Sequence, residues 1–261
     1  VSSVGALALD PQNPDLIWVG TGEGNPRNSN TGGAGIYRSI DGGKSWQLMG
    51  LEKTRHIHRI LVHPYNPKVV YVAAIGNPWA DSEHRGVYKT IDGGKSWQKI
   101  LYRNPATGAA EMVMDPQNPD KILVNMWEHR RNPWFFKSGG EGSGLFITHD
   151  GGETWVEKTE KDGLPKGELG RMGLAIAASQ SSRIYAFIEK KGKNALYRSD
   201  DGGNKWSKIS EDENIGNRPF YYAEIYVDPQ NENRVYSIWS VISRSEDGGK
   251  TWEVIAPYSY I

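Results

Sequence analysis

The chain has 261 residues, which is enough for one large β domain or two smaller ones. Its 31 basic side chains balance its 31 acidic ones, so the overall charge gives no reason to expect nucleic acid or an anionic membrane as a partner. The sequence contains no cysteine, which excludes disulfides, thiolate chemistry and cysteine-based zinc sites. No stretch is long and apolar enough to predict a membrane-spanning helix.

A phrase of eight residues, built on Asp-Gly-Gly and Trp, returns five times along the chain. Its copies begin at residues 39, 90, 148, 199 and 245 and read SIDGGKSW, TIDGGKSW, THDGGETW, SDDGGNKW and SEDGGKTW. A period of about fifty residues in a chain rich in glycine and aromatic residues indicates propeller blades or a similar array.

Each repeat divides into four short apolar runs bounded by turn signals. In the first repeat these runs are VGALALD, LIWVGTG, GIYRSID and SWQLMG, and no helical period competes with them. We therefore predict an all-β propeller of five four-stranded blades in a single domain. The predicted blades span about 1–50, 51–102, 103–160, 161–210 and 211–261, and we expect them to be part of a larger ring.

The repeated phrase lacks the spacing of a phosphate-binding loop and the alternating acids of a calcium-binding loop. A turn fits better, because Asp can accept backbone hydrogen bonds, glycine allows positive φ and Trp can cover the hairpin. The phrase resembles the Asp-box, also called the bacterial neuraminidase repeat, and that resemblance implies a structural hairpin remote from the active face. The residues expected to form this scaffold are Asp41, Trp46, Asp92, Trp97, Asp150, Trp155, Asp201, Trp206, Asp247 and Trp252.

The irregular loops on the opposite face are the candidates for function. Three of them are long, at 21–35, 76–86 and 128–144, and each contains Asn-Pro followed by Arg or Trp. Arginine offers a planar fork to carboxylates and tryptophan offers a stacking face, so the local excess of Arg favours a ligand with an acidic group. The predicted ligand contacts are Arg27, Arg55, His56, His58, Arg59, Trp79, Arg85, Arg130, Arg131 and Trp134.

Structural roles for some of these side chains stay open. Trp79 and Trp134 could serve only as the core of their own loops, and Arg59 could pair with Glu111 of the neighbouring blade. His56 and His58 share one side of a strand and could bind zinc with His84 or Glu83. Since no third ligand has diagnostic spacing, we predict no metal and no cofactor.

Several longer segments resemble sortilin-type propeller proteins, especially large bacterial exported homologues labelled glycosyl-hydrolase-like. These segments include VGTGEGNPRNS, GVYKTIDGGKSW and RPFYYAEIYVDP. The resemblance implies a binding role toward a peptide, a protein or a glycan, and a location outside the cell, in the periplasm or at the cell surface. Sialidases are disfavoured, because no Arg-Ile-Pro segment precedes the first repeated phrase. Xyloglucan-cleaving enzymes, a further Asp-box family, place two catalytic Asp between paired propellers, which five blades cannot form alone.

We therefore predict a non-catalytic ligand-binding module. The alternative is a glycoside hydrolase, which needs two carboxylates facing each other across a pocket. The carboxylates available on the long loops are Glu83, Glu128 and Glu23.

Overall fold

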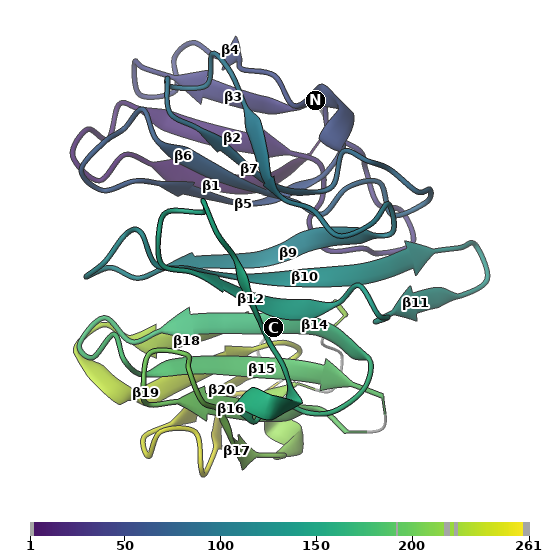
Figure 1. The fold of residues 1–261 in the computed structure, drawn as a ribbon, viewed down its shortest axis with the longest axis vertical. Coiled ribbons are helices and arrows are strands. Elements are labelled where there is room, and N and C mark those ends of the chain that lie inside the picture. The colour runs from purple at the N-terminus through teal and green to yellow at the C-terminus, as the bar shows by residue number, and fades with distance from the viewer. Residues whose placement is uncertain (1–2, 192, 217–219, 222–223, 258–261) are drawn as a thin grey trace. The chain divides into compact units, whose positions relative to one another are not determined.

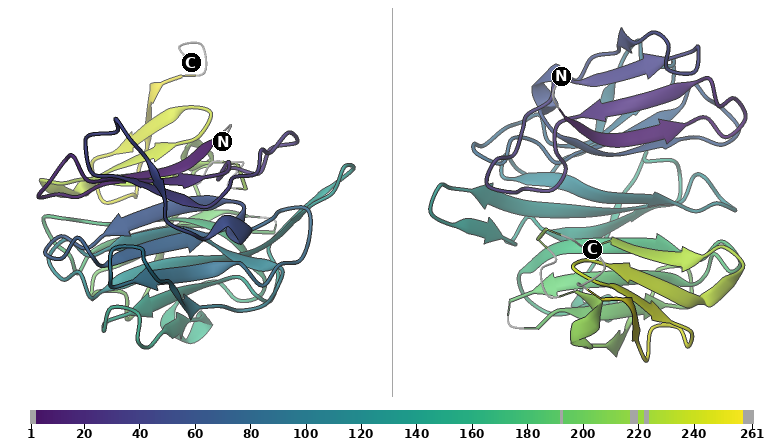
Figure 2. Two further views of the ribbon diagram at one scale, coloured as in Figure 1. Left: turned by 90° about the horizontal axis from the view of Figure 1, so that it is seen from above. Right: turned by 180° about the vertical axis from the view of Figure 1, so that it is seen from behind.

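The computed structural model describes residues 3–191, 193–216, 220–221 and 224–257. Within these ranges the chain forms 21 β-strands and three single-turn 3₁₀ helices, η1 (Glu52–Thr54), η2 (Glu160–Asp162) and η3 (Glu213–Ile215). The strands make five sheets, and neighbouring strands in four of them follow the order of the chain (Figures 1 and 2). The all-β class predicted from the sequence is confirmed at this level.

The chain divides into two compact units. The first contains Val1–Met112 and Met126–Lys137, and the second contains Val113–Asn125 and Ser138–Ile261. The first unit holds two complete sheets. Their strands are β1 (Val4–Leu9), β2 (Ile17–Thr21), β3 (Ile36–Ser39) and β4 (Gln47–Leu48), then β5 (Ile57–Val62), β6 (Val70–Ala74), β7 (Gly86–Thr90) and β8 (Gln98–Leu101).

The second unit also holds two complete sheets, the fourth and fifth along the chain. Their strands are β14 (Leu169–Ile176), β15 (Ile184–Lys190), β16 (Ala195–Ser199) and β17 (Ser207–Ser210), then β18 (Glu224–Asp228), β19 (Asn231–Ile238), β20 (Ile242–Ser245) and β21 (Glu253–Ala256). Every paired strand in these two sheets is antiparallel to its neighbour.

The third sheet differs from the sequence prediction, and its residues are divided between the two units. Its strands are β9 (Thr107–Met114), β10 (Ile122–Arg131), β11 (Phe136–Ser138), β12 (Gly144–Thr148) and β13 (Val156–Lys158). β10 runs on through Glu128–Arg131, the start of the loop predicted at 128–144, and β11 pairs with it as a fifth strand. The long loop predicted at 128–144 is therefore partly a hairpin.

Apolar side chains that alternate along the strands form the core of each unit. In the first unit, Trp18 and Ile36 pack with Ile60, Val70 and other side chains from the second sheet. In the second unit, one core joins the third and fourth sheets and another joins the fourth and fifth. In these pairs of sheets, side chains of the two facing sheets pack together, as expected when successive residues of a strand point to opposite faces.

The five repeated segments, here called box turns, each fold around their Asp. In the first, Asp41 accepts hydrogen bonds from the Ser39 hydroxyl at 2.7 Å, the Ser45 backbone N–H at 2.9 Å and the Ser45 hydroxyl at 2.6 Å. Both glycines have positive φ, 69° at Gly42 and 87° at Gly43, a conformation that a side chain would strain. In the fourth box turn Lys205 offers no hydroxyl, and Asp201 instead accepts the backbone N–H groups of Asn204 and Lys205.

The box tryptophans do not behave alike. The indole N–H groups of Trp46, Trp206 and Trp252 donate to a glycine carbonyl of their own turn, as the hairpin interpretation expects. Trp97 instead donates to the Met49 carbonyl of the preceding sheet, at 2.7 Å, and lies edge-on to Trp18. Trp46 is 44% exposed, so it lies on its own turn with nearly half of its surface in water.

This difference gives a stability prediction. Trp97→Ala should lower the free energy of unfolding by about 3–5 kcal/mol, because it removes a large aromatic from an interface between two sheets. Trp46→Ala should cost clearly less, because nearly half of its surface already meets water. Urea denaturation of both variants measures the two costs, and equal costs would contradict this assignment.

Acid should weaken the box turns. Hydrogen bonds from the Ser45 hydroxyl, the Ser45 N–H and the Ser39 hydroxyl lower the pKa of Asp41 to about 2, and the pKa of Asp92 and Asp150 is lowered in the same way. A carboxyl whose pKa is lower in the folded than in the unfolded state stabilises above its unfolded value, near pH 4, and this stabilisation is lost as the pH falls.

The melting temperature should therefore hold from pH 7 to pH 5 and fall between about pH 4 and pH 2. An Asp41→Asn variant cannot titrate at this position and should show a shallower decline than the parent chain. An unchanged decline would mean that Asp41 does not contribute to the acid sensitivity.

Candidate ligand-binding site

All ten predicted ligand contacts lie in the first unit, on segments that hydrogen bonds tie together. The Arg131 N–H donates to the Pro78 carbonyl at 2.8 Å, and an Arg130 guanidinium N–H donates to the Trp79 carbonyl at 3.2 Å. The Arg131 side chain also donates to the Asn28 side chain. The loops at 21–35 and 76–86 and the end of β10 therefore form one connected surface.

Glycines in the first loop let the chain pass close to two histidines. A Cβ at Gly24 would lie 1.7 Å from Nδ1 of His58, so only glycine fits there. His56 is buried, and its Nδ1 donates to the Glu23 carbonyl at 2.9 Å. Burial lowers the pKa of His56 to about 4, so its ring is neutral at pH 7 and holds the loop. Both predicted histidine contacts are therefore corrected, because these buried side chains pack the loop rather than face a ligand.

The zinc ligands that the sequence suggests beside this histidine pair do not come together. Among the described residues, His56, His84 and Glu83 do not gather with His58 into a set of donor atoms close enough to share an ion. His84 is exposed, and the His56 ring is taken up by the Glu23 carbonyl.

Arg27 and Arg59 are each bound to a carboxylate. Arg27 pairs with Glu23 at 2.5 Å, and this hydrogen bond lowers the pKa of Glu23 despite partial burial. Arg59 holds the buried Glu111 with two bonds, Nε at 2.6 Å and Nη2 at 2.8 Å. The ion pair that the sequence left open for Arg59 is thus present, and its fork is not free for a ligand.

Arg85 does not face a ligand either, although the sequence singled it out. Its side chain is 0% exposed and donates to the carbonyls of Ile75, Asn77 and Ala80, which closes the 76–86 loop on itself. Burial lowers the pKa of Arg85 to about 10, which still leaves it charged at neutral pH. The prediction of a ligand contact is corrected: Arg85 is the internal tie of its loop.

The basic side chains at the end of β10 are also engaged. Arg130 pairs with Asp81, and Arg131 lies over the Phe136 ring at 4.9 Å. Glu128, a carboxylate proposed for the hydrolase alternative, pairs with Lys137 at 2.7 Å. Of the predicted arginines, Arg55 is the one that is exposed with no ion pair to a described residue.

The large side chains that this surface exposes to solvent are aromatic. Trp134 is 80% exposed, Phe135 51% and Trp79 40%. The two tryptophans follow Asn-Pro pairs, and the hydrogen bonds from Arg130 and Arg131 hold the two loop segments together. The sequence interpretation did not include Phe135, because in the run Trp134-Phe135-Phe136 the sequence alone does not tell which rings face solvent. A loop-core role for Trp134 is inconsistent with its exposure.

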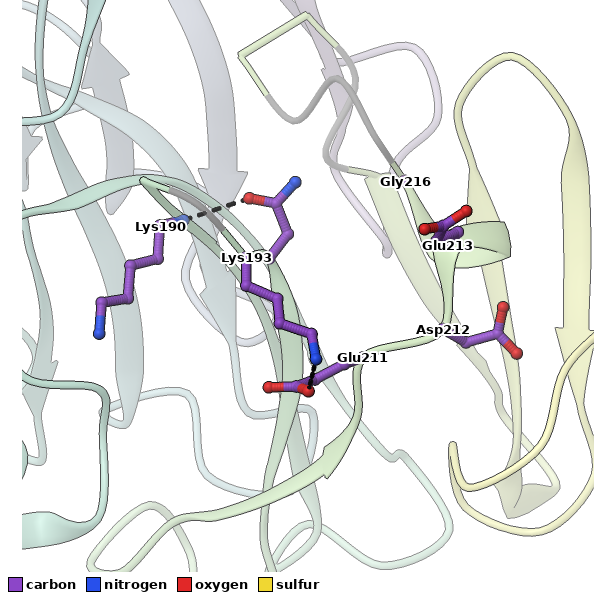
Figure 3. A pocket seen from close by; sticks show the side chains of 7 residues that line it. Lys190, Lys193, Glu211, Asp212, Glu213 and Gly216 are labelled. Atoms are coloured by element: carbon purple, nitrogen blue, oxygen red, sulfur yellow. Dashed lines mark hydrogen bonds and ion pairs between the residues drawn. The ribbon is translucent and has the colours of Figure 1, made fainter.

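Two hollows lie in the second unit, away from all these residues. One, of about 330 Å³, is lined by Lys190, Lys193, Asn194, Glu211, Asp212, Glu213 and Gly216 (Figure 3). Lys193 and Glu211 form an ion pair in its lining. The other, of about 590 Å³, lies beside η2 and has several Glu and Lys side chains, among them Glu141, Glu160 and Lys161, in its lining. No helix in the described residues is long and apolar enough to span a membrane.

The Arg59–Glu111 pair gives a test of which arginines are structural. Arg59→Met should destabilise the fold by about 3–5 kcal/mol, because it leaves the buried Glu111 carboxylate uncompensated. Arg27→Met, at an exposed pair, should cost at most about 1 kcal/mol. Chemical denaturation measures both. If Arg59→Met leaves stability unchanged and weakens binding of a ligand instead, the structural assignment is wrong.

Comparison with known proteins supports the same fold. A xyloglucanase from Paenibacillus sp is 26% identical over 291 residues, covering 96% of this chain and 26% of the relative. Xyloglucanase Xgh74A from Acetivibrio thermocellus is 24% identical over 294 residues, covering 97% and 32%. The chain therefore spans only about a quarter to a third of these curated relatives.

Solved structures give the fold. The GH74 xyloglucanase from Xanthomonas campestris superposes with a TM-score of 0.71 at 17% identity, covering 97% of this chain and 39% of that one. YCF48 bound to D1 peptide superposes with a TM-score of 0.56 at 17% identity, covering 96% and 66%. These likenesses support a β-propeller fold. Residues 34–166, about half of the chain, match the model of the Sortilin-Vps10 family, described as sortilin, neurotensin receptor 3. The chain belongs to the Sortilin-Vps10 family.

Proposed function

We propose that the chain is a non-catalytic module that binds a neutral glucan chain, of the xyloglucan type, through exposed aromatic side chains of its first unit. The observation that carries the proposal is the exposure of Trp134, Phe135 and Trp79 on one connected surface. A flat aromatic ring with a polar edge suits the apolar face of a sugar ring. Large aromatics left in water on loops usually serve recognition.

The pairing and burial of the arginines argue against the acidic ligand that the sequence predicts. Arg27, Arg59 and Arg130 are each neutralised by a carboxylate, and Arg85 is buried. Most of the predicted arginines are thus paired or buried, with Arg55 as the exposed exception, so the surface offers little attraction to an anionic group. The stacking surface of the aromatic rings remains. A neutral sugar chain therefore fits better than a uronic acid or a peptide carboxylate.

The relatives support a glucan over a peptide. Two curated relatives that cover nearly the whole chain are named xyloglucanases. The peptide-bound structure, YCF48 with D1 peptide, is 17% identical and supports the fold alone. Because a polysaccharide does not cross a cell membrane, we also propose that the protein acts outside the cytoplasm.

Hydrolysis is the second candidate, favoured by the names of the same relatives. It requires one carboxyl with a raised pKa as acid and a second carboxylate at a fixed separation. Of the three carboxylates considered, Glu23 is held by Arg27 with a lowered pKa, and Glu128 is held by Lys137. Glu83 lies exposed on its loop. This pattern supports binding without cleavage.

Removing one stacking ring tests the proposal. Trp134→Ala should weaken binding of a xyloglucan oligosaccharide about tenfold, or about 1.4 kcal/mol. Its melting temperature should stay the same, because the side chain is 80% exposed. Isothermal titration calorimetry measures the affinity.

Tyr65→Ala is the matched control, because Tyr65 is an aromatic that is 70% exposed, in the turn between β5 and β6. It should bind as the parent chain does. Equal loss in both variants, or no loss in Trp134→Ala, would refute the stacking site. If the chain releases reducing sugar from xyloglucan and Glu128→Gln abolishes that release, the proposed function is hydrolysis and not binding alone.

A further inference from the structure

Each box turn contains the dipeptide Asp-Gly, at 41–42, 92–93, 150–151, 201–202 and 247–248. In such a pair the backbone nitrogen of the glycine can attack Cγ of the preceding Asp. The nitrogen loses its proton, the carboxyl group loses its hydroxyl as water, and a five-membered succinimide forms. Water then opens the ring at either carbonyl, which gives back Asp or gives isoaspartate, with the main chain running through Cγ. Glycine favours the attack, because no Cβ shields its nitrogen.

The attacking nitrogen is held in the same way in all five turns. The first glycine donates its N–H to a backbone carbonyl near the start of the second strand of its own sheet. The nitrogen–oxygen distances, in chain order, are 3.1, 3.0, 2.9, 2.8 and 2.9 Å, and the acceptors are Asp15, Lys68, Asp120, Ser182 and Asn233. The glycine therefore gives no reason for one turn to react faster than another.

The carboxyl group, in contrast, is held differently in the fourth turn. In the other four turns, Oδ2 of the Asp accepts a hydroxyl hydrogen bond at 2.6–2.7 Å, and the donors are Ser45, Ser96, Thr154 and Thr251. Lys205 stands at this place in the fourth turn, and its ammonium group donates to the Lys161 carbonyl instead. Among the described residues, donors reach only Oδ1 of Asp201 and none reaches its Oδ2.

The missing hydroxyl favours the reaction at Asp201 in two ways. One hydrogen bond fewer must break before Cγ can approach the glycine nitrogen. The carboxyl must also be protonated to lose water, and the Ser45 hydroxyl is the main cause that lowers the pKa of Asp41 to about 2. The pKa of Asp201 is lowered chiefly by the Lys205 backbone N–H, and no hydroxyl at Oδ2 adds to this effect.

Asn204 adds a further feature that is particular to the fourth turn. Its side-chain amide donates to the Asp201 backbone carbonyl at 2.8 Å. This carbonyl belongs to the peptide bond that supplies the attacking nitrogen, so the hydrogen bond withdraws electron density and makes the Gly202 N–H more acidic. The matching residues of the other turns are three lysines and Glu153, which lack a carboxamide. Asp201 is also exposed, so water can reach the ring that forms.

We propose that Asp201 is a site of spontaneous modification, which forms a succinimide with Gly202 and reopens to isoaspartate faster than the other four box aspartates. Isoaspartate adds one methylene to the main chain and so displaces the N–H groups of Gly202 and Gly203 from their acceptors. Trp206, which donates to the Gly203 carbonyl, is buried in the core of the third and fourth sheets. The modification therefore loosens this core. This chemistry is independent of the proposed glucan ligand.

Incubation of the folded chain at mildly acidic pH, followed by mass spectrometry, tests the proposal. The succinimide is detected by the loss of one water, and electron-transfer fragmentation distinguishes isoaspartate from Asp at each position. We expect isoaspartate to accumulate at position 201 about fivefold faster than at the other four, the factor that the loss of one ordinary hydrogen bond gives. Equal accumulation in all five turns, or faster accumulation in another turn, overturns the proposal.

Two substitutions exchange the feature between turns. Lys205→Ser supplies the missing hydroxyl and should slow the reaction at Asp201 to the rate of the other turns, whereas Ser45→Ala should speed it at Asp41. Lys208→Ala, at an exposed pair with Glu211, is the control and should change none of the five rates. An unchanged rate at Asp201 in Lys205→Ser overturns the proposal.

Unfolding the chain in urea separates the fold from the local sequence. All five pairs are followed by a second glycine, so in urea they should react at similar rates. A preference for Asp201 that persists in urea overturns the assignment to the fold. In the folded chain, the fraction that carries isoaspartate at position 201 should melt at a lower temperature than the unmodified fraction, and equal melting would contradict the predicted loosening of the core.

Discussion

The rest of the structure depends on the hydrogen bonds that the Asp carboxylate accepts within each box turn. Asp41 gathers the hydroxyls of Ser39 and Ser45 and a backbone N–H into one turn of eight residues. That turn fixes two glycines at positive φ, which no other residue adopts without strain. It closes the last hairpin of each sheet and sets the position of the first glycine carbonyl.

The glycine carbonyl then links sheets together. Arg38 reaches Gly93 in the first unit, and Arg198 reaches Gly248 in the second, so a local turn also provides an acceptor for the sheet before it. Apolar faces alone tolerate sliding, because hydrophobic contact is not directional. A hydrogen bond to one carbonyl selects one register. The repeat therefore specifies both the hairpin and the way in which hairpins stack.

The sequence predicted the strands well, because alternation and turn residues are local signals. It missed the continuation of β10 through Arg131 and the short strand β11, since their pairing brings together segments separated by an aromatic turn. Alignment of the repeats did indicate the Arg59–Glu111 pair. It could not show that Arg85 is buried, because its partners are backbone carbonyls, which have no signature in the sequence. Charged residues in loops thus looked like a binding surface, although they mostly bind one another.

Because most of the arginines are paired or buried and the aromatic rings are exposed, we propose a ligand that is held by stacking. The most direct test is the affinity for a xyloglucan oligosaccharide measured across a range of sodium chloride concentrations. Paired charges should contribute little, so the account predicts the same affinity from about 0.05 M to about 0.5 M salt, although screening over this range is strong. An affinity that falls steeply with salt would mean that the arginines, not the rings of Trp79 and Trp134, hold the ligand.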